Sequence, residues 1–271
     1  MLKDITIGQY FPGKSFVHNM DSRMKIVLTF AYIIMLFMAT NIPSLMIGVV
    51  VGILLYAISK IPFNMIIKSL KPILPIIFFT ALLNMFFVDI GNTLFEFWII
   101  KITDRGLTMA ILMCIRIVAL IAGTSLLTYT TSPIALTDAI EQLLGPLNRF
   151  KVPVHELAMM MTIALRFIPT LIEETEKIMN AQKARGADLE TGSMIQRAKA
   201  LIPILIPLFV SAFRRADELA LAMECRCYRG SEGRTRMKQL KMTYRDIIAA
   251  IIMVVLIAGV IALNIYLPKV I

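Results

Sequence analysis

The sequence predicts an all-α integral membrane protein with about five transmembrane helices and a cytoplasmic or interfacial insert of two or three long amphipathic helices. Of its 271 residues, 58% are hydrophobic and only 17% are charged, whereas a soluble domain averages about 45–50% and about 25%. Several apolar runs approach the ~20 residues that a helix needs to cross a bilayer. Most of the charged side chains fall in one stretch, residues 131–243. These observations exclude an ordinary soluble enzyme and a disordered chain.

Five apolar runs define the expected spans. Asn41-Ile42-Pro43-Ser44 separates the first two runs, which predicts a tight helical hairpin. No acidic residue lies within any run, and Arg116 interrupts the fourth. We expect Arg116 to pair inside the bundle or to extend toward an interface, in preference to a role in a transport pathway. The five runs are 26–40, 45–59, 72–88, 107–129 and 247–267.

The charges between the spans predict the orientation. Basic residues dominate before the first span and between the second and third, whereas the loop 89–105 is more acidic. The positive-inside bias places the N-terminus in the cytoplasm and the C-terminus outside. The expected regions are therefore a membrane bundle of four spans (1–130), a cytoplasmic helical region (131–244) and a final transmembrane helix (245–271).

Two long amphipathic helices are expected in the cytoplasmic region. From Leu157 to Gln182, apolar residues recur in steps of three and four, which predicts one helix face. We expect a bend at Pro169 and an end near Gly186.

The second amphipathic helix is expected to follow Pro203 and Pro207 and to end at Gly230 and Gly233. It carries three small residues four apart, a spacing that lets helix backbones approach closely. A basic run, 234–245, then leads into the last span. The small residues are Ala212, Ala216 and Ala220.

The chain lacks the usual signs of catalysis. No phosphate-binding loop occurs, and His155-Glu156 begins like a zinc-protease motif without the second histidine. Cys225 and Cys227 could supply at most half of the ligands of a metal site. The favoured interpretation is that they are small side chains that pack at a helix end. The basic run borders a span, so membrane topology explains it without nucleic acid. We expect no catalytic residue, bound cofactor or metal.

Two short motifs each place one arginine at the end of a long helix. They are Ala184-Arg185-Gly186 and Cys225-Arg226-Cys227. A helix C-terminus favours a cation, and guanidinium binds a carboxylate of a partner in a planar, bidentate way. Taken singly, either arginine would be read as a solvated residue at a helix end.

With their surroundings, the motifs resemble the transmembrane coupling component (T component) of energy-coupling factor transporters. The resemblance covers the whole chain in layout and the stretch 131–236 in detail. The matching segments are 131–133, 152–158, 164–170, 181–188, 213–220 and 228–236.

The resemblance implies a non-catalytic subunit in the plasma membrane of a prokaryote. It implies that the chain joins two cytoplasmic ABC-type ATPases, which use the ATP, to a small membrane subunit that binds substrate (S component). Membrane lipid is the remaining partner. The family imports vitamins such as riboflavin, folate, biotin, thiamine or cobalamin, or it imports nickel and cobalt. The alternative is a stand-alone secondary transporter, whose signs, intramembrane acids or inverted repeats, are not evident.

The resemblance also assigns roles to residues. Each arginine of the family's two Ala-Arg-Gly motifs docks in one ATPase, and the first motif is intact as Ala184, Arg185 and Gly186. The second keeps only Arg226, because cysteines stand at the alanine and glycine positions. Cysteine is small enough for docking, but its Cβ hinders the close approach that glycine allows. The expected surfaces for the S component are 155–175 and 201–213.

Overall fold

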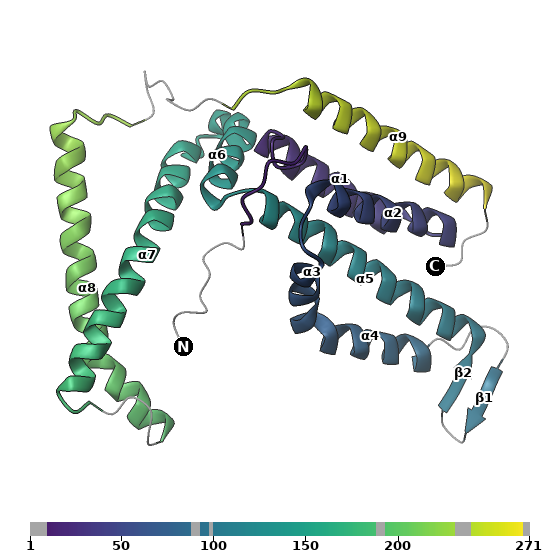
Figure 1. Ribbon diagram of the computed structural model, residues 1–271, viewed down its shortest axis with the longest axis horizontal. Helices are drawn as coiled ribbons and strands as arrows, with labels where there is room; N and C mark the ends of the chain where they lie inside the picture. The colour runs from purple at the N-terminus through teal and green to yellow at the C-terminus, as the bar shows by residue number, and fades with distance from the viewer. Residues whose placement is uncertain (1–9, 88–92, 98–99, 188–192, 231–239, 268–271) are drawn as a thin grey trace. The chain divides into compact units, whose positions relative to one another are not determined.

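The chain is almost entirely α-helical in the computed structural model (Figure 1). The structure describes residues 10–87, 93–97, 100–187, 193–230 and 240–267. The predicted all-α membrane class is confirmed, with a β-hairpin as a small addition. The helices are α1 (Ser22–Met38), α2 (Ile42–Ser59), α3 (Phe63–Leu70), α4 (Leu74–Phe87), α5 (Asp104–Thr130), α6 (Pro133–Leu144), α7 (Val154–Ala184), α8 (Met194–Cys225) and α9 (Tyr244–Tyr266), with 3-10 turns at Lys71–Ile73 and Gly145–Phe150.

The hairpin lies in a stretch that was expected to be a loop. Strand β1 (Thr93–Phe97) pairs antiparallel with β2 (Ile100–Thr103). The two strands consist largely of aromatic and β-branched residues, which favour an extended backbone. The loop prediction considered only charge and missed this local preference.

Five helical segments of the described residues are long and apolar enough to cross a membrane. They are α2, α3 with α4 (Phe63–Phe86), α5, α7 and α9. The run 26–40 lies largely in α1, which has 17 residues and is slightly shorter than the ~20 that a full span needs. Helix α7, which the sequence placed in the cytoplasmic region, contains an apolar stretch of sufficient length.

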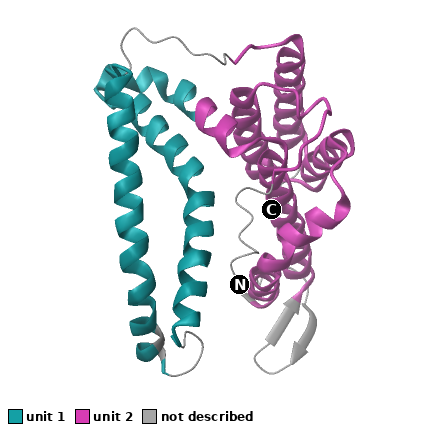
Figure 2. Cartoon of the chain, turned by 60° about the vertical axis from the view of Figure 1, so that its left-hand side comes forward, with its two compact units in different colours: residues 1–7, 140–238 teal, residues 8–139, 239–271 magenta. Residues whose placement is uncertain are grey.

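The described residues form two compact units (Figure 2). The bundle unit comprises residues 8–139 and 239–271, and the helix-pair unit comprises residues 1–7 and 140–238. Of the crossings between the units, one falls inside α6 and one falls before α9, while the crossing at residues 7–8 lies outside the described residues. The predicted regions 1–130, 131–244 and 245–271 were defined by their location relative to the membrane, so they stay a prediction.

Helix α1 packs against α2, α5 and α9 in the bundle unit. A close approach at Gly123 completes this packing, because the Tyr32 ring leaves no room there for a Cβ atom. The Tyr32 hydroxyl donates to the carbonyl of Gly48, 3.0 Å away. The fully packed core consists of Tyr32, Met35, Leu36, Ala39, Leu45, Leu112, Ala119, Met253 and Val260.

Arg116 lies buried on α5 and donates from its guanidinium to the carbonyl of Ala39. Ala39 is the C-cap of α1, where the helix leaves carbonyls without intrahelical partners and carries partial negative charge. The arginine is thus paired inside the bundle, with a helix end in place of a carboxylate.

Candidate functional site

The helix-pair unit is built on α7 and α8, which run antiparallel (Figures 1 and 2). Near one end, the Gln182 side chain donates to the carbonyl of Pro203, 3.3 Å away. Further along, Glu174 accepts from the Ser211 hydroxyl at 2.7 Å and from Arg215 at 2.6 Å. Because residue numbers fall along α7 as they rise along α8, the C-terminus of each helix lies toward the N-terminus of the other.

Helix α8 begins at Met194, before both of the prolines that it was expected to follow. Ser193 and Gln196 form a capping box that satisfies the first backbone N–H groups of α8. The helix then runs through Pro203 and Pro207. The prediction that α8 follows these prolines was therefore wrong, because the cap and the packing on α7 outweigh two missing backbone bonds.

The ends of both helices also differ in detail from expectation. Helix α8 ends at Cys225, before Gly230, while Gly233 lies outside the described residues. Ala216 and Ala220 are exposed, so they do not bring α8 against another described helix as the spacing had suggested. Helix α7 runs through Pro169 without interruption, and the bend expected there stays a prediction. Of the basic run 234–245, only residues from 240 onward are described.

The first arginine motif forms the C-terminal cap of α7. Arg185 is the C-cap residue, and Gly186 follows with a left-handed φ of +87°. The N–H of Gly186 donates to the carbonyl of Lys183, and the N–H of Ala187 donates to that of Gln182, both at 3.0 Å. These two bonds define a Schellman cap.

The second arginine motif forms the same cap at the end of α8. Arg226 is the C-cap residue, and Cys227 takes the left-handed position with φ +55°. The N–H of Cys227 donates to Glu224 at 2.8 Å, and the N–H of Tyr228 donates to Met223 at 3.0 Å. Cysteine thus adopts the glycine conformation, at the cost of strain that a Cβ brings there.

The structure gives the glycine a second role. The resemblance connects this glycine with close approach of another chain, which stays a prediction. A Cβ built on Gly186 meets no atom within 4 Å. Within this chain, glycine is therefore needed for its left-handed backbone, because there is room for a side chain. The sequence could identify Gly186 as the end of a helix, because glycine is common there. A cysteine gives no such signal, so the same conformation at Cys227 could not be predicted.

All six motif residues are exposed, and the two motifs lie at opposite ends of the helix pair. From Pro203, which faces Gln182 near the end of α7, α8 continues for 22 more residues to Cys225. This corresponds to about 33 Å along the axis at ~1.5 Å per residue. The structure therefore does not bring Arg185 and Arg226 together into one site.

Apolar side chains are exposed along both predicted contact segments. On α8 seven of them lie within residues 201–213, and their exposed fractions reach 68% at Phe213. Such a continuous apolar surface is typical of contact with lipid or with another membrane protein. The larger members are Leu157, Met160, Met161 and Ile168 on α7, and Leu201, Ile202, Leu205, Ile206, Phe209, Val210 and Phe213 on α8.

His155 is engaged in a structural contact. Its Nδ1 lies 2.9 Å from the Glu141 carboxylate, which joins α7 to α6. Within the described part of the chain, no group of three or more His, Cys, Asp or Glu side chains could hold a metal ion. Cys225 and Cys227 are free thiols.

The fold defines a multi-pass, predominantly helical membrane protein, and two of its long helices end in an exposed arginine. The family model described as cobalt transport protein (CbiQ) matches residues 13–237. The protein of Clostridium kluyveri named energy-coupling factor transporter transmembrane protein EcfT is 56% identical over 258 residues, which cover 95% of this chain and 96% of the relative.

Two further relatives carry the same name. The protein of Ruminiclostridium cellulolyticum is 55% identical over 264 residues, covering 97% of this chain and 98% of the relative. That of Bacillus subtilis is 46% identical over 258 residues, covering 95% and 97%. The chain belongs to this family, and it is a transmembrane component of an energy-coupling factor transporter. The resemblance stated from the sequence is confirmed.

Proposed function

We propose that the chain is the non-catalytic coupling subunit of an ATP-driven importer, with its N-terminus in the cytoplasm of a prokaryotic cell. Arg185 and Arg226 each dock in one of two cytoplasmic ABC-type ATPases, which hydrolyse the ATP. The imported substrate is a vitamin, or a metal ion, held by a small membrane subunit. The chain itself binds neither cofactor nor metal.

One observation carries the proposal. The two arginines occupy the same position of the same cap, each exposed at the end of a long helix. A Schellman cap satisfies the last carbonyls of the helix internally, so each guanidinium is left to bind a partner's carboxylate. The ~33 Å between the helix ends suits one arginine per ATPase better than both in one groove.

The apolar surface of α7 and α8 supports the second contact. A small membrane subunit is itself apolar where lipid surrounds it, and the methionines at 160 and 161 suit a surface that must repack. Movement of the ATPases would displace the two helix ends, and long helices transmit such displacement as rigid rods. The bound membrane subunit would then reorient in the bilayer.

The test is affinity purification of the tagged chain from its native membrane, followed by mass spectrometry. Wild type should bring ABC-type ATPases and at least one small membrane protein. Arg185→Glu and Arg226→Glu should each lower ATPase recovery by roughly tenfold or more, because a repulsive charge replaces a bidentate ion pair. Arg229→Glu, exposed and three residues beyond Arg226, is the matched control and should leave recovery unchanged.

Other outcomes would overturn the proposal. If wild type elutes alone while other membrane complexes survive, the secondary-transporter alternative moves to the front. If ATPases co-purify equally with Arg185→Glu, Arg226→Glu and wild type, the docking role of the arginines is wrong. The small membrane proteins recovered with wild type would identify the substrate class.

A further inference from the structure

The two connections that flank α7 and α8 are both hydrogen-bonded to the same turn of the bundle unit. The first connection crosses between the units inside α6, which closely follows the end of α5, where Thr130 is the last helical residue. The second returns through residues 240–243 into α9. Both Thr130 and Leu240 are bonded through their carbonyls to side chains of the first turn of α1. This convergence is not visible in the sequence, where the connections lie about a hundred residues apart.

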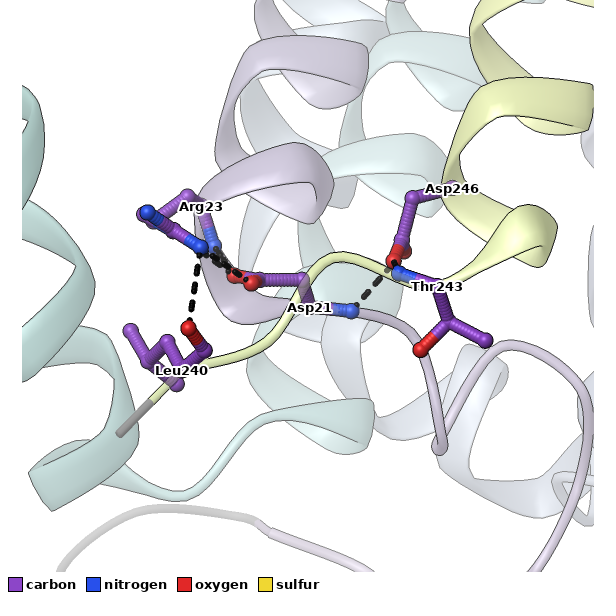
Figure 3. Close-up of polar contacts among 5 residues, drawn as sticks. All are labelled: Asp21, Arg23, Leu240, Thr243 and Asp246. Atoms are coloured by element: carbon purple, nitrogen blue, oxygen red, sulfur yellow. Dashed lines mark hydrogen bonds and ion pairs between the residues drawn. The ribbon is translucent and has the colours of Figure 1, made fainter. Parts of the chain in front are cut away.

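Arg23 holds the returning connection (Figure 3). Its guanidinium forms a fork with the Asp21 carboxylate at 2.7 and 3.2 Å, and it donates to the carbonyl of Leu240 at 3.3 Å. Asp21, the N-cap of α1, is buried and also accepts from the backbone N–H of Arg23 at 2.9 Å. The fork fixes the direction of the guanidinium, so the Leu240 carbonyl meets an oriented donor.

Asp246 joins the same turn to α9 (Figure 3). Its carboxylate accepts from the N–H of Thr243 at 2.7 Å, which caps α9, and from the N–H of Asp21 at 2.9 Å. Only 1% of the residue is exposed. A single buried carboxylate therefore serves the N-termini of two helices that are 225 residues apart.

Lys25 holds the departing connection. Its ammonium donates to the carbonyls of Thr130 at 2.9 Å and His18 at 3.0 Å. Thr130 lies in the last turn of α5, where carbonyls lack intrahelical partners. The side chain is buried and lines a cavity of about 370 Å³ with almost wholly apolar walls. Poor access of water strengthens these hydrogen bonds.

The cluster is balanced in charge, with two acids and two bases. Burial alone would raise the pKa of Asp21, but the hydrogen bonds and charge of Arg23 outweigh burial and hold that pKa below its ordinary value. Asp21 is therefore ionised at neutral pH and keeps Arg23 oriented. We call Asp21, Arg23, Lys25, Thr243 and Asp246, with the carbonyls of Thr130 and Leu240, the junction cluster.

We propose that the junction cluster is the mechanical anchor of the transporter subunit, and that Arg23 and Lys25 are positioning residues which hold the two inter-unit connections to α1. Displacement of α7 and α8 reaches the bundle unit along the chain through these two connections. With both fixed to one turn, the displacement moves α1, α5 and α9 together and is not absorbed by local loosening. The transmission step rests on the proposed coupling function, whereas the anchoring does not.

Anchoring is tested by amide hydrogen exchange on the full chain in lipid nanodiscs. Arg23→Gln should speed exchange in residues 240–246 by roughly tenfold, because a charge-assisted hydrogen bond and an oriented ion pair are lost. Lys25→Met should do the same in 130–136 and spare 240–246, so each variant is the control for the other. Arg245→Gln removes a neighbouring charge that lies over the Tyr244 ring and should change neither segment.

Transmission is tested in proteoliposomes that hold the chain with its co-purified ATPases and small membrane subunits. Radiolabelled riboflavin, folate, biotin, thiamine and cobalamin are offered in turn, and the one that wild type accumulates is used. Arg23→Gln and Lys25→Met should retain ATPase recovery and ATP hydrolysis while uptake per ATP falls roughly fivefold. Arg23→Lys keeps the charge but loses the fork, and it should give an intermediate ratio even if Arg23→Gln folds poorly.

The outcomes separate the claims. Unchanged exchange in 240–246 of Arg23→Gln and in 130–136 of Lys25→Met overturns the anchor. Faster exchange with an unchanged ratio of uptake to ATP hydrolysis overturns transmission. A parallel fall of uptake and ATP hydrolysis also overturns it, because it indicates a merely structural role for these residues. A wild-type complex without ATPases defeats the proposed function, and the exchange experiment still judges the anchor.

Discussion

The two units of this chain are stabilised in different ways. In the described part of the bundle unit, α1, α2, α5 and α9 enclose a continuous core, and every buried charged residue of the described chain lies there. In the described part of the helix-pair unit, only Val154, Ala158 and Ile204 are buried. The difference indicates that the bundle unit has a core of its own, whereas the helix-pair unit exposes apolar surface of the kind that contacts lipid or another membrane protein.

The sharpest test of this difference exchanges one acid in each unit for alanine. Asp246→Ala leaves the buried N–H groups of Asp21 and Thr243 without an acceptor and should lower the free energy of unfolding by about 3 kcal/mol. Glu174→Ala breaks contacts to half-exposed Arg215 and to Ser211 and should cost about 1 kcal/mol or less. Both are measured by unfolding in mixed SDS micelles. Equal costs would contradict the comparison.

The second test removes one large apolar side chain from each unit. Leu45 is fully buried, so Leu45→Ala should lower the free energy of unfolding by about 2 kcal/mol, since a cavity remains. Phe209 is 59% exposed, so Phe209→Ala should change the free energy of unfolding by less than about 0.5 kcal/mol. It should instead reduce recovery of the small membrane subunit in the purification above. A larger loss of stability for Phe209→Ala would show that α8 packs within the chain.

The smallest effects are expected at the two caps, where the helix-pair unit can be altered without touching the bundle. Cys227→Gly should stabilise the end of α8 by about 1 kcal/mol, and Gly186→Ala should destabilise the end of α7 by about as much, because each changes the Cβ penalty of a left-handed residue. Hydrogen exchange of the Tyr228 amide should slow in Cys227→Gly, and that of the Ala187 amide should become faster in Gly186→Ala. Unfolding of the bundle unit should not change, and a change in it would show that the units are not independent.

Much of the fold followed from local patterns. The apolar run 107–129 lies within α5, and the break at Asn41 to Ser44 became the turn into α2 with Pro43 in its first turn. These features depend on residues close together in the chain. The start of α8 did not follow, because two prolines were given more weight than the capping box before them. The β-hairpin was missed because the charges of its segment were given more weight than its aromatic and β-branched residues.

The candidate site was only partly visible in the sequence. The arginine motifs and the helix ends could be identified, since glycine and a cation at a helix end are local signals. The left-handed Cys227 could not, because nothing in its side chain favours that conformation. The junction cluster could not either. Asp21 and Asp246 each precede or begin an apolar run, but no local pattern indicates that two residues 225 positions apart share hydrogen bonds.

The junction cluster also sets an order on synthesis. Asp246 leaves the ribosome 225 residues after Asp21. At about 5–20 residues per second, the N-terminal turn waits roughly 10–45 s for its partners. During that interval α1, α2 and α5 can already pack in the membrane, while the buried N–H of Asp21 has no carboxylate to bind. Closure of the cluster therefore waits for the start of α9, and a chain truncated before α9 would keep the N–H of Asp21 without its carboxylate acceptor.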